Sequence, residues 1–288
     1  MTRIGLLTLV LLALISPIVS ARILNVPDEF PTIQSAIDSC KYRDTILVEQ
    51  GHYHENLIID SKIITLLSLF YLSASSDLIS RTIIDGDSLG SAITIQNSNS
   101  SEINGFTIQN GFAEQGAGIK VLHSSPTIRN NYIINNNATD KGGAIFSDSS
   151  NIRVKQNFID HNTAEYGAGI YCTRYFVYID SNIISNNHSP SQIGRGTAVY
   201  LVDSTPVIRY NQISNNSGSG IVCIRANGDI ENNSIYSNYN SQSGGGLYFE
   251  NCRPIYLLII FIAILRIFLE EVFIQIHQPP RLLIITSY

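Results

Sequence analysis

Four charged residues could bind a ligand together, because they recur near the same position of successive repeated segments: Arg129, Arg153, Asp180 and Arg209. Guanidinium groups hold carboxylates in a two-pronged geometry, so such a row would suit an acidic sugar. The same row could instead consist of cross-strand ion pairs on a solvated sheet, each contributing little stability. The tyrosines Tyr171, Tyr175 and Tyr178 could similarly stack on sugar rings or be ordinary surface aromatics.

A metal site was considered at His52, His54 and Glu55, because alternate residues of a strand share one face. Two imidazoles without a third convincing ligand do not complete such a site. The sequence therefore predicts no metal and no cofactor.

The acidic residues do not form a recognisable catalytic motif. Lyases that act on polyuronates need a carboxylate cluster for Ca²⁺ and a base, and related hydrolases need paired Asp residues. Here the acids of the central chain are scattered singly: Glu114, Asp140, Asp148, Asp160, Glu165, Asp180, Asp203 and Asp229. No Asp-Asp, Gly-His-Gly or Arg-Ile-Lys sequence occurs. The catalytic residues, if any exist, stay unassigned.

Two sequence markers repeat with a period of about 25 residues. An aliphatic residue after a Gly-rich triplet recurs at intervals of 26, 25, 29, 22 and 26 residues: Ile119, Ile145, Ile170, Val199, Ile221 and Leu247. An Asn two residues before an Ile recurs in step with it: Asn131, Asn157, Asn182, Asn211 and Asn233. Asn tolerates left-handed backbone and its amide both donates and accepts, so this column is expected to form a structural ladder.

Each repeat contains three apolar stretches of three to five residues, with alternating polar positions and Gly, Asn, Ser or Asp at the breaks. This pattern is typical of short strands. A unit so small must stack on its copies to bury its apolar face. We therefore expect an all-β, single-stranded right-handed parallel β-helix, in which Ile145 and Ile170 occupy adjacent rungs.

A short amphipathic helix is expected before the first coils. Apolar residues follow helical spacing between Pro31 and Cys40, and Pro31 suits a first turn. Strands are expected at 45–48, 56–59 and 63–68. The helix would cover the open N-terminal end of the core.

The opening resembles that of bacterial pectin-lyase-like β-helix proteins, in Phe30-Pro31-Thr32-Ile33-Gln34-Ser35-Ala36-Ile37-Asp38, Asp44-Thr45-Ile46-Leu47-Val48 and Gly51-His52-Tyr53-His54-Glu55-Asn56. The later segments are similar to that family's parallel β-helix repeats, and the resemblance covers about 26–253. It departs from the family at Lys41-Tyr42-Arg43, where small residues and Gly are usual. It implies the fold and leaves activity open, because the fold hosts lyases, hydrolases, epimerases and non-catalytic surface proteins.

The N-terminus is typical of an export signal. Arg3 precedes the apolar stretch 6–19, and Val19-Ser20-Ala21 offers small residues for cleavage. We expect a signal peptide at 1–21, an N-terminal cap and first coils at 22–84, and β-helix repeats at 85–254. Only 14% of residues are charged and the net charge is −5, which argues against nucleic-acid binding.

The four cysteines of an exported chain raise the question of disulfides. Cys172 and Cys223 lie two repeats apart with Leu201 between them. Two rungs separate Cα atoms by about 9.6 Å, beyond the roughly 7 Å that a disulfide spans. We expect buried thiols there, whereas a Cys223–Cys252 bridge stays conceivable.

The tail at 255–288 does not fit the repeats. One interpretation is a membrane anchor, although 255–269 is short for a span and contains Arg266. Our preferred hypothesis is translation out of frame: read from the third base of each codon, 269–275 can encode Gly-Gly-Gly-Ile-Tyr-Thr, about 26 residues after Gly244. The chain would then be a fragment of a longer solenoid, with no membrane span.

These observations predict an exported, non-catalytic surface or extracellular protein whose partner is a polysaccharide or cell-surface glycan. The alternative is a lyase or glycoside hydrolase that acts on an acidic polysaccharide.

Overall fold

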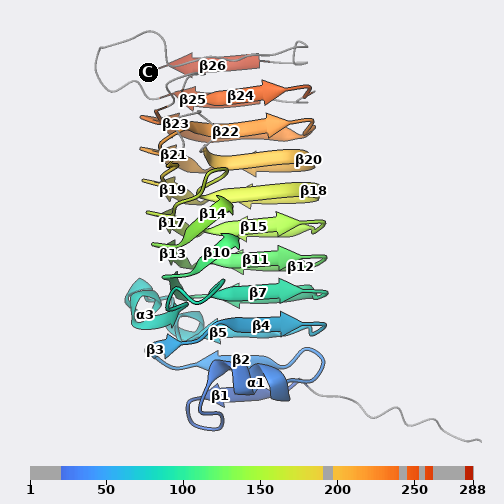
Figure 1. The fold of residues 1–288 in the computed structure, drawn as a ribbon, viewed down its shortest axis with the longest axis vertical. Coiled ribbons are helices and arrows are strands. Elements are labelled where there is room, and N and C mark those ends of the chain that lie inside the picture. The colour runs from blue at the N-terminus through green and yellow to red at the C-terminus, as the bar shows by residue number, and fades with distance from the viewer. Residues whose placement is uncertain (1–20, 191–196, 240–244, 253–256, 262–282, 288) are drawn as a thin grey trace, which may run out of the picture.

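The protein is a parallel β-helix whose coils stack along one long axis (Figure 1). The structure, a computed structural model, describes residues 21–190, 197–239, 245–252, 257–261 and 283–287. Most regular coils contribute one strand to each of three parallel sheets, so strands distant in sequence become neighbours. The predicted single-stranded parallel β-helix is confirmed.

The strands fall into three sheets that we number in the order in which each regular coil visits them. Sheet one contains β4 (Leu57–Asp60), β7 (Ile93–Gln96), β11 (Ile119–Leu122), β15 (Ile145–Asp148), β22 (Ser219–Ile224) and β24 (Leu247–Glu250). Sheet two contains β1 (Ile23–Val26), β2 (Thr45–Val48), β5 (Thr65–Ser68), β8 (Asn99–Asn104), β12 (Ser125–Arg129), β16 (Ile152–Lys155), β25 (Leu257–Phe261) and β26 (Leu283–Ser287). Sheet three contains β3 (Gly51–His54), β6 (Thr82–Asp85), β9 (Thr107–Gln109), β13 (Tyr132–Ile134), β17 (Phe158–Asp160), β19 (Ile183–Ser185) and β21 (Gln212–Ser214).

Some strands of the later coils continue through a corner from one sheet to the next. β18 (Ile170–Asp180) and β20 (Thr197–Arg209) belong to sheets one and two, and β23 (Asp229–Tyr236) belongs to sheets two and three. A separate two-stranded sheet of β10 (Phe112–Gln115) and β14 (Asn137–Lys141) lies beside the main coils. Two short helices, α2 (Phe70–Ser73) and α3 (Ser76–Arg81), interrupt the chain between β5 and β6.

The interior of the solenoid is a file of aliphatic side chains. Ile145 pairs with Ile119 on one side and with Ile170 on the other, and all three are fully buried. Val199, Ile221 and Leu247 continue the same file in register. The predicted adjacency of Ile145 and Ile170 is confirmed, because alternate residues of each strand point inward while their neighbours face out.

Asn side chains form a ladder at the corner between sheets two and three. The members are Asn131, Asn157, Asn182, Asn211 and Asn233. Each side-chain oxygen accepts hydrogen bonds from the backbone N–H and the side-chain amide of the Asn one coil before it, at 2.9–3.1 Å. Polar groups that would otherwise be buried without partners are thereby satisfied.

A second ladder stands at the other end of sheet three and was missing from the sequence prediction: Asn136, Asn162, Asn187, Asn216 and Asn238. Each member follows a member of the first ladder by five residues. The expectation that the ladder Asn themselves adopt left-handed backbone was wrong. That conformation belongs to the residue before each, as at Gln156 (φ 55°) and Ser181 (φ 57°).

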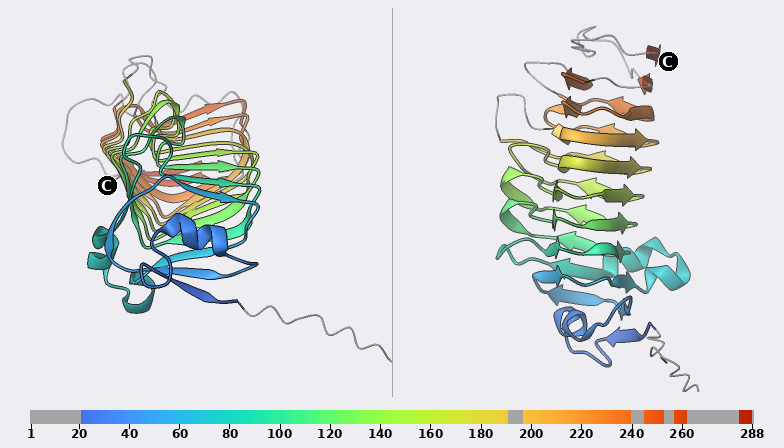
Figure 2. Two further views of the ribbon diagram at one scale, coloured as in Figure 1. Left: turned by 60° about the horizontal axis from the view of Figure 1, so that its bottom comes forward. Right: turned by 90° about the vertical axis from the view of Figure 1, so that its right-hand side faces the viewer.

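Helix α1 (Ile33–Ser39) covers the N-terminal end of the core, as Figure 2 shows. It packs against β1, β2 and β4 and buries Ile33, Ala36 and Ile37. The expected start at Pro31 was early by two residues, because the Thr32 side chain accepts from the backbone N–H of Ser35 and makes Thr32 the N-cap. The expected strands at 45–48, 56–59 and 63–68 appear as β2, β4 and β5.

All four cysteines are buried free thiols. Leu201 lies between Cys172 and Cys223 in register, which explains why this pair cannot be bridged. Burial raises the pKa of Cys223 well above its usual value, and the Cys252 thiol instead donates to the backbone carbonyl of Cys223 at 3.2 Å.

Within the described part of the chain, no helix is long and apolar enough to cross a bilayer. The expected signal peptide lies almost entirely outside the described residues. So does most of the aberrant tail, of which only the strand backbones of β25 and β26 are placed. Both remain predictions.

Candidate functional site

The four predicted ligand-binding residues all lie on the outer face of sheet two, but not in one file. The register aligns Arg129 with Lys155, Lys155 with Asp180, Asp180 with Arg209, and Arg209 with Glu231. Arg153 stands two residues earlier on β16, aligned with Thr127 and Tyr178. We call these neighbouring files, from Arg129 and Arg153 to Arg209, the outer face of sheet two.

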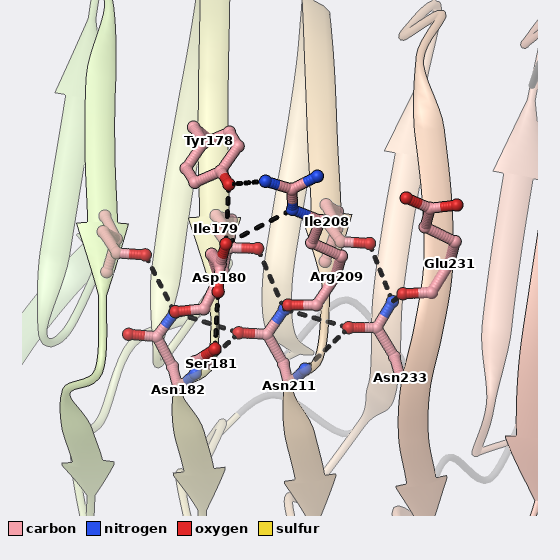
Figure 3. A network of polar contacts seen from close by, with 11 residues as sticks. Tyr178, Ile179, Asp180, Ser181, Asn182, Ile208, Arg209, Asn211, Glu231 and Asn233 are labelled. Carbon is pink, nitrogen blue, oxygen red and sulfur yellow. Dashed lines mark hydrogen bonds and ion pairs between the residues drawn. The ribbon is translucent and has the colours of Figure 1, made fainter.

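Tyr178, Asp180 and Arg209 form one connected network (Figure 3). The Tyr178 hydroxyl donates to Oδ2 of Asp180 at 2.6 Å and accepts a hydrogen bond from Nη2 of Arg209. Nε of Arg209 donates to the same Asp180 oxygen at 3.3 Å, and the guanidinium carbon lies 5.0 Å from the centre of the Tyr178 ring. Ser181 donates to the other carboxylate oxygen.

These contacts shift the pKa of each group towards its ordinary charge state. Burial and the bond to Asp180 raise the pKa of Tyr178. Bonds to Tyr178 and then Asp180 raise the pKa of Arg209. Burial alone would raise the pKa of Asp180, but donation from Ser181, Tyr178 and Arg209 outweighs it and lowers that pKa. The network holds a neutral phenol, a carboxylate and a guanidinium at neutral pH.

Such a network is poorly suited to take a proton from substrate. A general base works best with a pKa near the working pH. The pKa values of Tyr178 and Arg209 are shifted upward, away from that range, and the Asp180 carboxylate is already engaged by three donors. The geometry therefore favours recognition of a charged group over proton transfer.

The cations of this face differ in whether a carboxylate already neutralises them. Arg129 donates from Nε to Glu102 at 2.8 Å, and Arg209 is paired with Asp180. Arg153 and Lys155 have no ion pair with any residue that the structure describes. Lys155 instead lies over the Tyr178 ring, with its nitrogen 5.8 Å from the ring centre. Two adjacent cations on β16 are thus open to an external anion.

The three tyrosines considered for sugar stacking have different environments. Tyr171 belongs to a stack on the outside of sheet one, with its ring centre 5.6 Å from Phe146 and 5.4 Å from Tyr200. It is only 7% exposed, so its ring faces are already covered. Tyr175 is 60% exposed at a corner of β18, and Tyr178 is packed against Arg209.

Glu55 does not join the two histidines as a metal ligand. Its carboxylate accepts from the backbone N–H groups of Ile33 and Gln34, at 2.9 and 2.8 Å, and so satisfies the first turn of α1. His52 and His54 do share one exposed face of β3, and the structure brings Asp85 of β6 to them.

Two functional candidates were missed in the sequence, Lys155 and Asp85. Lys155 was overlooked because the equivalent strand position was assigned to Arg153. A register counted from the Asn ladder would have found it, since Arg129, Lys155, Asp180 and Arg209 each precede a ladder Asn by two residues. Asp85 follows His52 by 33 residues, and no repeat marker connects the two.

Comparison with known proteins concerns the scaffold. The profile of a family described as "Right handed beta helix region" matches residues 56–235. Among solved structures, the chain is similar to an alginate lyase from Paenibacillus sp. str. FPU-7, with 13% sequence identity and a TM-score of 0.38, over 83% of this chain and 91% of that one. Curated proteins include no significant match.

Proposed function

The chain belongs to the right-handed β-helix family, and from this premise we propose that it is an exported, non-catalytic surface or extracellular protein that binds an acidic glycan. The binding site is the outer face of sheet two. Export rests on the apolar N-terminal segment 6–19 and the small residues before position 22.

One observation carries this proposal: Arg153 and Lys155 lie side by side on β16 without an ion-pair partner among the described residues. Arg129 on the preceding coil and Arg209 two coils further on extend the cationic surface in the direction of the axis. Successive rungs are about 4.8 Å apart. An extended polyanion lying parallel to the axis can therefore meet a cation on several successive coils.

The absence of turnover is supported by the protonation states of the same face. Tyr178, Asp180 and Arg209 are held in their ordinary charge states, and each is engaged by the others. A lyase or hydrolase acting on acidic polysaccharide is the alternative. Its test is the appearance of unsaturated products or new reducing ends.

The experiment measures binding of the full chain to immobilised polygalacturonate and alginate, with a neutral glucan as reference. The double variant Arg153→Gln/Lys155→Gln is expected to weaken binding at least about tenfold, equivalent to about 1.4 kcal/mol. The matched control is Arg81→Gln/Arg225→Gln, which removes the same charge from cations already paired with Asp77 and Asp203. Binding should also weaken with salt.

Equal losses in the test and control variants would indicate unspecific attraction to net charge and contradict the assigned face. Equal binding to the neutral glucan would contradict the acidic ligand. Product formed from either polyuronide would instead establish the enzyme.

A further inference from the structure

A cluster of potential metal ligands lies at the start of sheet three, on coils remote from the central rungs of the outer face of sheet two. His52 and His54 project from β3, and Asp85 ends β6, which pairs with β3 directly. One ligand atom from each of the three residues lies within 4.8 Å of the other two. Among the described residues, this is the one group of three or more His, Cys, Asp or Glu side chains that meets this criterion.

The two imidazoles are close and adjustable. Their ring centres are 4.2 Å apart and the rings are nearly parallel, at 24°. The His52 and His54 side chains are 45% and 56% exposed, so they can rotate without disturbing the core. A tetrahedral ion with bonds of about 2.0–2.1 Å needs ligand atoms about 3.4 Å apart. Small rotations of the exposed rings are enough to reach that spacing.

The carboxylate of Asp85 is held in place. Its side chain is only 4% exposed. Oδ2 accepts from Gln109 and Asn110 of the next coil, each at 2.8 Å, and Oδ1 accepts from the backbone N–H of Asp87 at 3.0 Å. These donors outweigh the effect of burial and lower the pKa of Asp85 to about 2. The ligand is therefore an oriented anion.

The hydrogen bonds of the histidines match the outer shell of a metal site. His54 contacts Asp87 through Nδ1 at 2.8 Å, which leaves Nε2 with an available lone pair. Metal-binding histidines commonly donate their other N–H to a carboxylate in this way. His52 Nε2 meets Asp85 Oδ2 at 2.8 Å, so an ion can take the place of the proton between them.

We propose that His52, His54 and Asp85 bind a divalent transition-metal ion of the zinc class. Two imidazole nitrogens and one carboxylate oxygen suit zinc and its neighbours nickel and copper, whereas calcium and magnesium prefer all-oxygen sites. Asp87 is the positioning residue for His54. Three protein ligands leave the fourth position to water, as in open zinc sites.

The experiment titrates Zn²⁺ into the full chain in competition with a chromophoric chelator, and repeats the titration with Ca²⁺. One equivalent of Zn²⁺ is expected to bind, without competition from Ca²⁺. His54→Gln should weaken zinc binding at least about tenfold, and Asp87→Asn by about 10- to 100-fold. Co²⁺ should give the absorption spectrum of a tetrahedral site.

The matched control is His161→Gln. His161 is also an exposed imidazole bonded to a carboxylate, that of Asp160, but it lies outside the metal cluster. Its loss should leave zinc affinity unchanged. Because His54 is exposed, circular dichroism should show that His54→Gln stays folded.

Failure of the wild-type chain to bind Zn²⁺ would overturn the proposal, as would equal affinities in wild type and His54→Gln. Equal competition by Ca²⁺ would overturn the assignment to a transition metal. The glycan experiment uses other residues, so either proposal can fail alone.

Discussion

Polar side chains inside this protein are tied into hydrogen-bonded files parallel to the axis. Asn182 is representative: its oxygen accepts from Asn157, and its amide donates to Asn211 and to the carbonyl oxygens of Val154 and Asp180. Every polar atom of the amide has a partner. Because a buried donor or acceptor is costly when unpaired, each member of the file depends on the next.

Replacing one member of the ladder should therefore destabilise the protein more than loss of a surface amide. Asn182→Ala leaves the backbone N–H of Asn157 and the carbonyl of Val154 without their partners, and we expect a loss of about 2–4 kcal/mol. Urea denaturation measures this change in the free energy of unfolding. The control Asn137→Ala removes an exposed amide on β14 and should cost well under half as much; equal losses would contradict the ladder's role.

Asp44 should make stability depend on acidity. Burial alone would raise its pKa, but hydrogen bonds from Arg22 and Lys41 outweigh burial and lower the pKa to about 2. A carboxyl with a lowered folded-state pKa stabilises the protein above its unfolded pKa of about 3.8, and that contribution is lost as pH falls towards 2.

The urea midpoint of wild type should therefore fall between pH 4 and pH 2 by more than that of Asp44→Asn. Asp38→Asn is the control at an exposed carboxyl of α1. Identical pH profiles for wild type and Asp44→Asn would show that this carboxyl is not linked to folding.

Single elements of the fold depend on contacts from neighbouring coils. Helix α1 has only seven residues, too few for stability in isolation. Its first turn is closed by Thr32 and by the carboxylate of Glu55, which arrives from the end of β3. Burial of its apolar face supplies the remaining stability.

Removal of the Glu55 carboxylate should loosen this helix. Glu55→Ala is expected to cost about 0.5–2 kcal/mol, the usual range for loss of an N-cap. Hydrogen exchange should show faster exchange at Ile33 and Gln34. Glu49→Ala removes an exposed carboxylate nearby, and protection of both amides should survive it; unchanged protection in Glu55→Ala would contradict the cap.

For the whole molecule, the solenoid is quasi-one-dimensional. Each coil pairs with the coil before and the coil after, as β15 does with β11 and β18. Stability in such a molecule approximates a sum of coil and interface terms. Damage to one coil should therefore be felt first by its immediate neighbours.

Ile170→Ala tests this expectation, because Ile170 is fully buried in the central file. We expect a loss of about 2–5 kcal/mol. Hydrogen exchange should accelerate in β15, β18 and β20 before it does in β2 and β5. Ile183→Ala, at a side chain 42% exposed on β19, is the control and should cost less; uniform acceleration along the axis would contradict the nearest-neighbour picture.

The sequence alone determined the architecture and its period. Like residues recur every 22 to 29 positions in two synchronous series, and segments too small to fold alone can bury those residues only by stacking. The tertiary structure decided which outward-facing residues meet. Corners of variable length separate sequence spacing from register, so Arg153 left the file that Lys155 occupies, and Asp85 joined His52 from 33 residues away. Interior contacts follow from burial, which every coil needs, whereas surface contacts depend on the register and on the path of each corner.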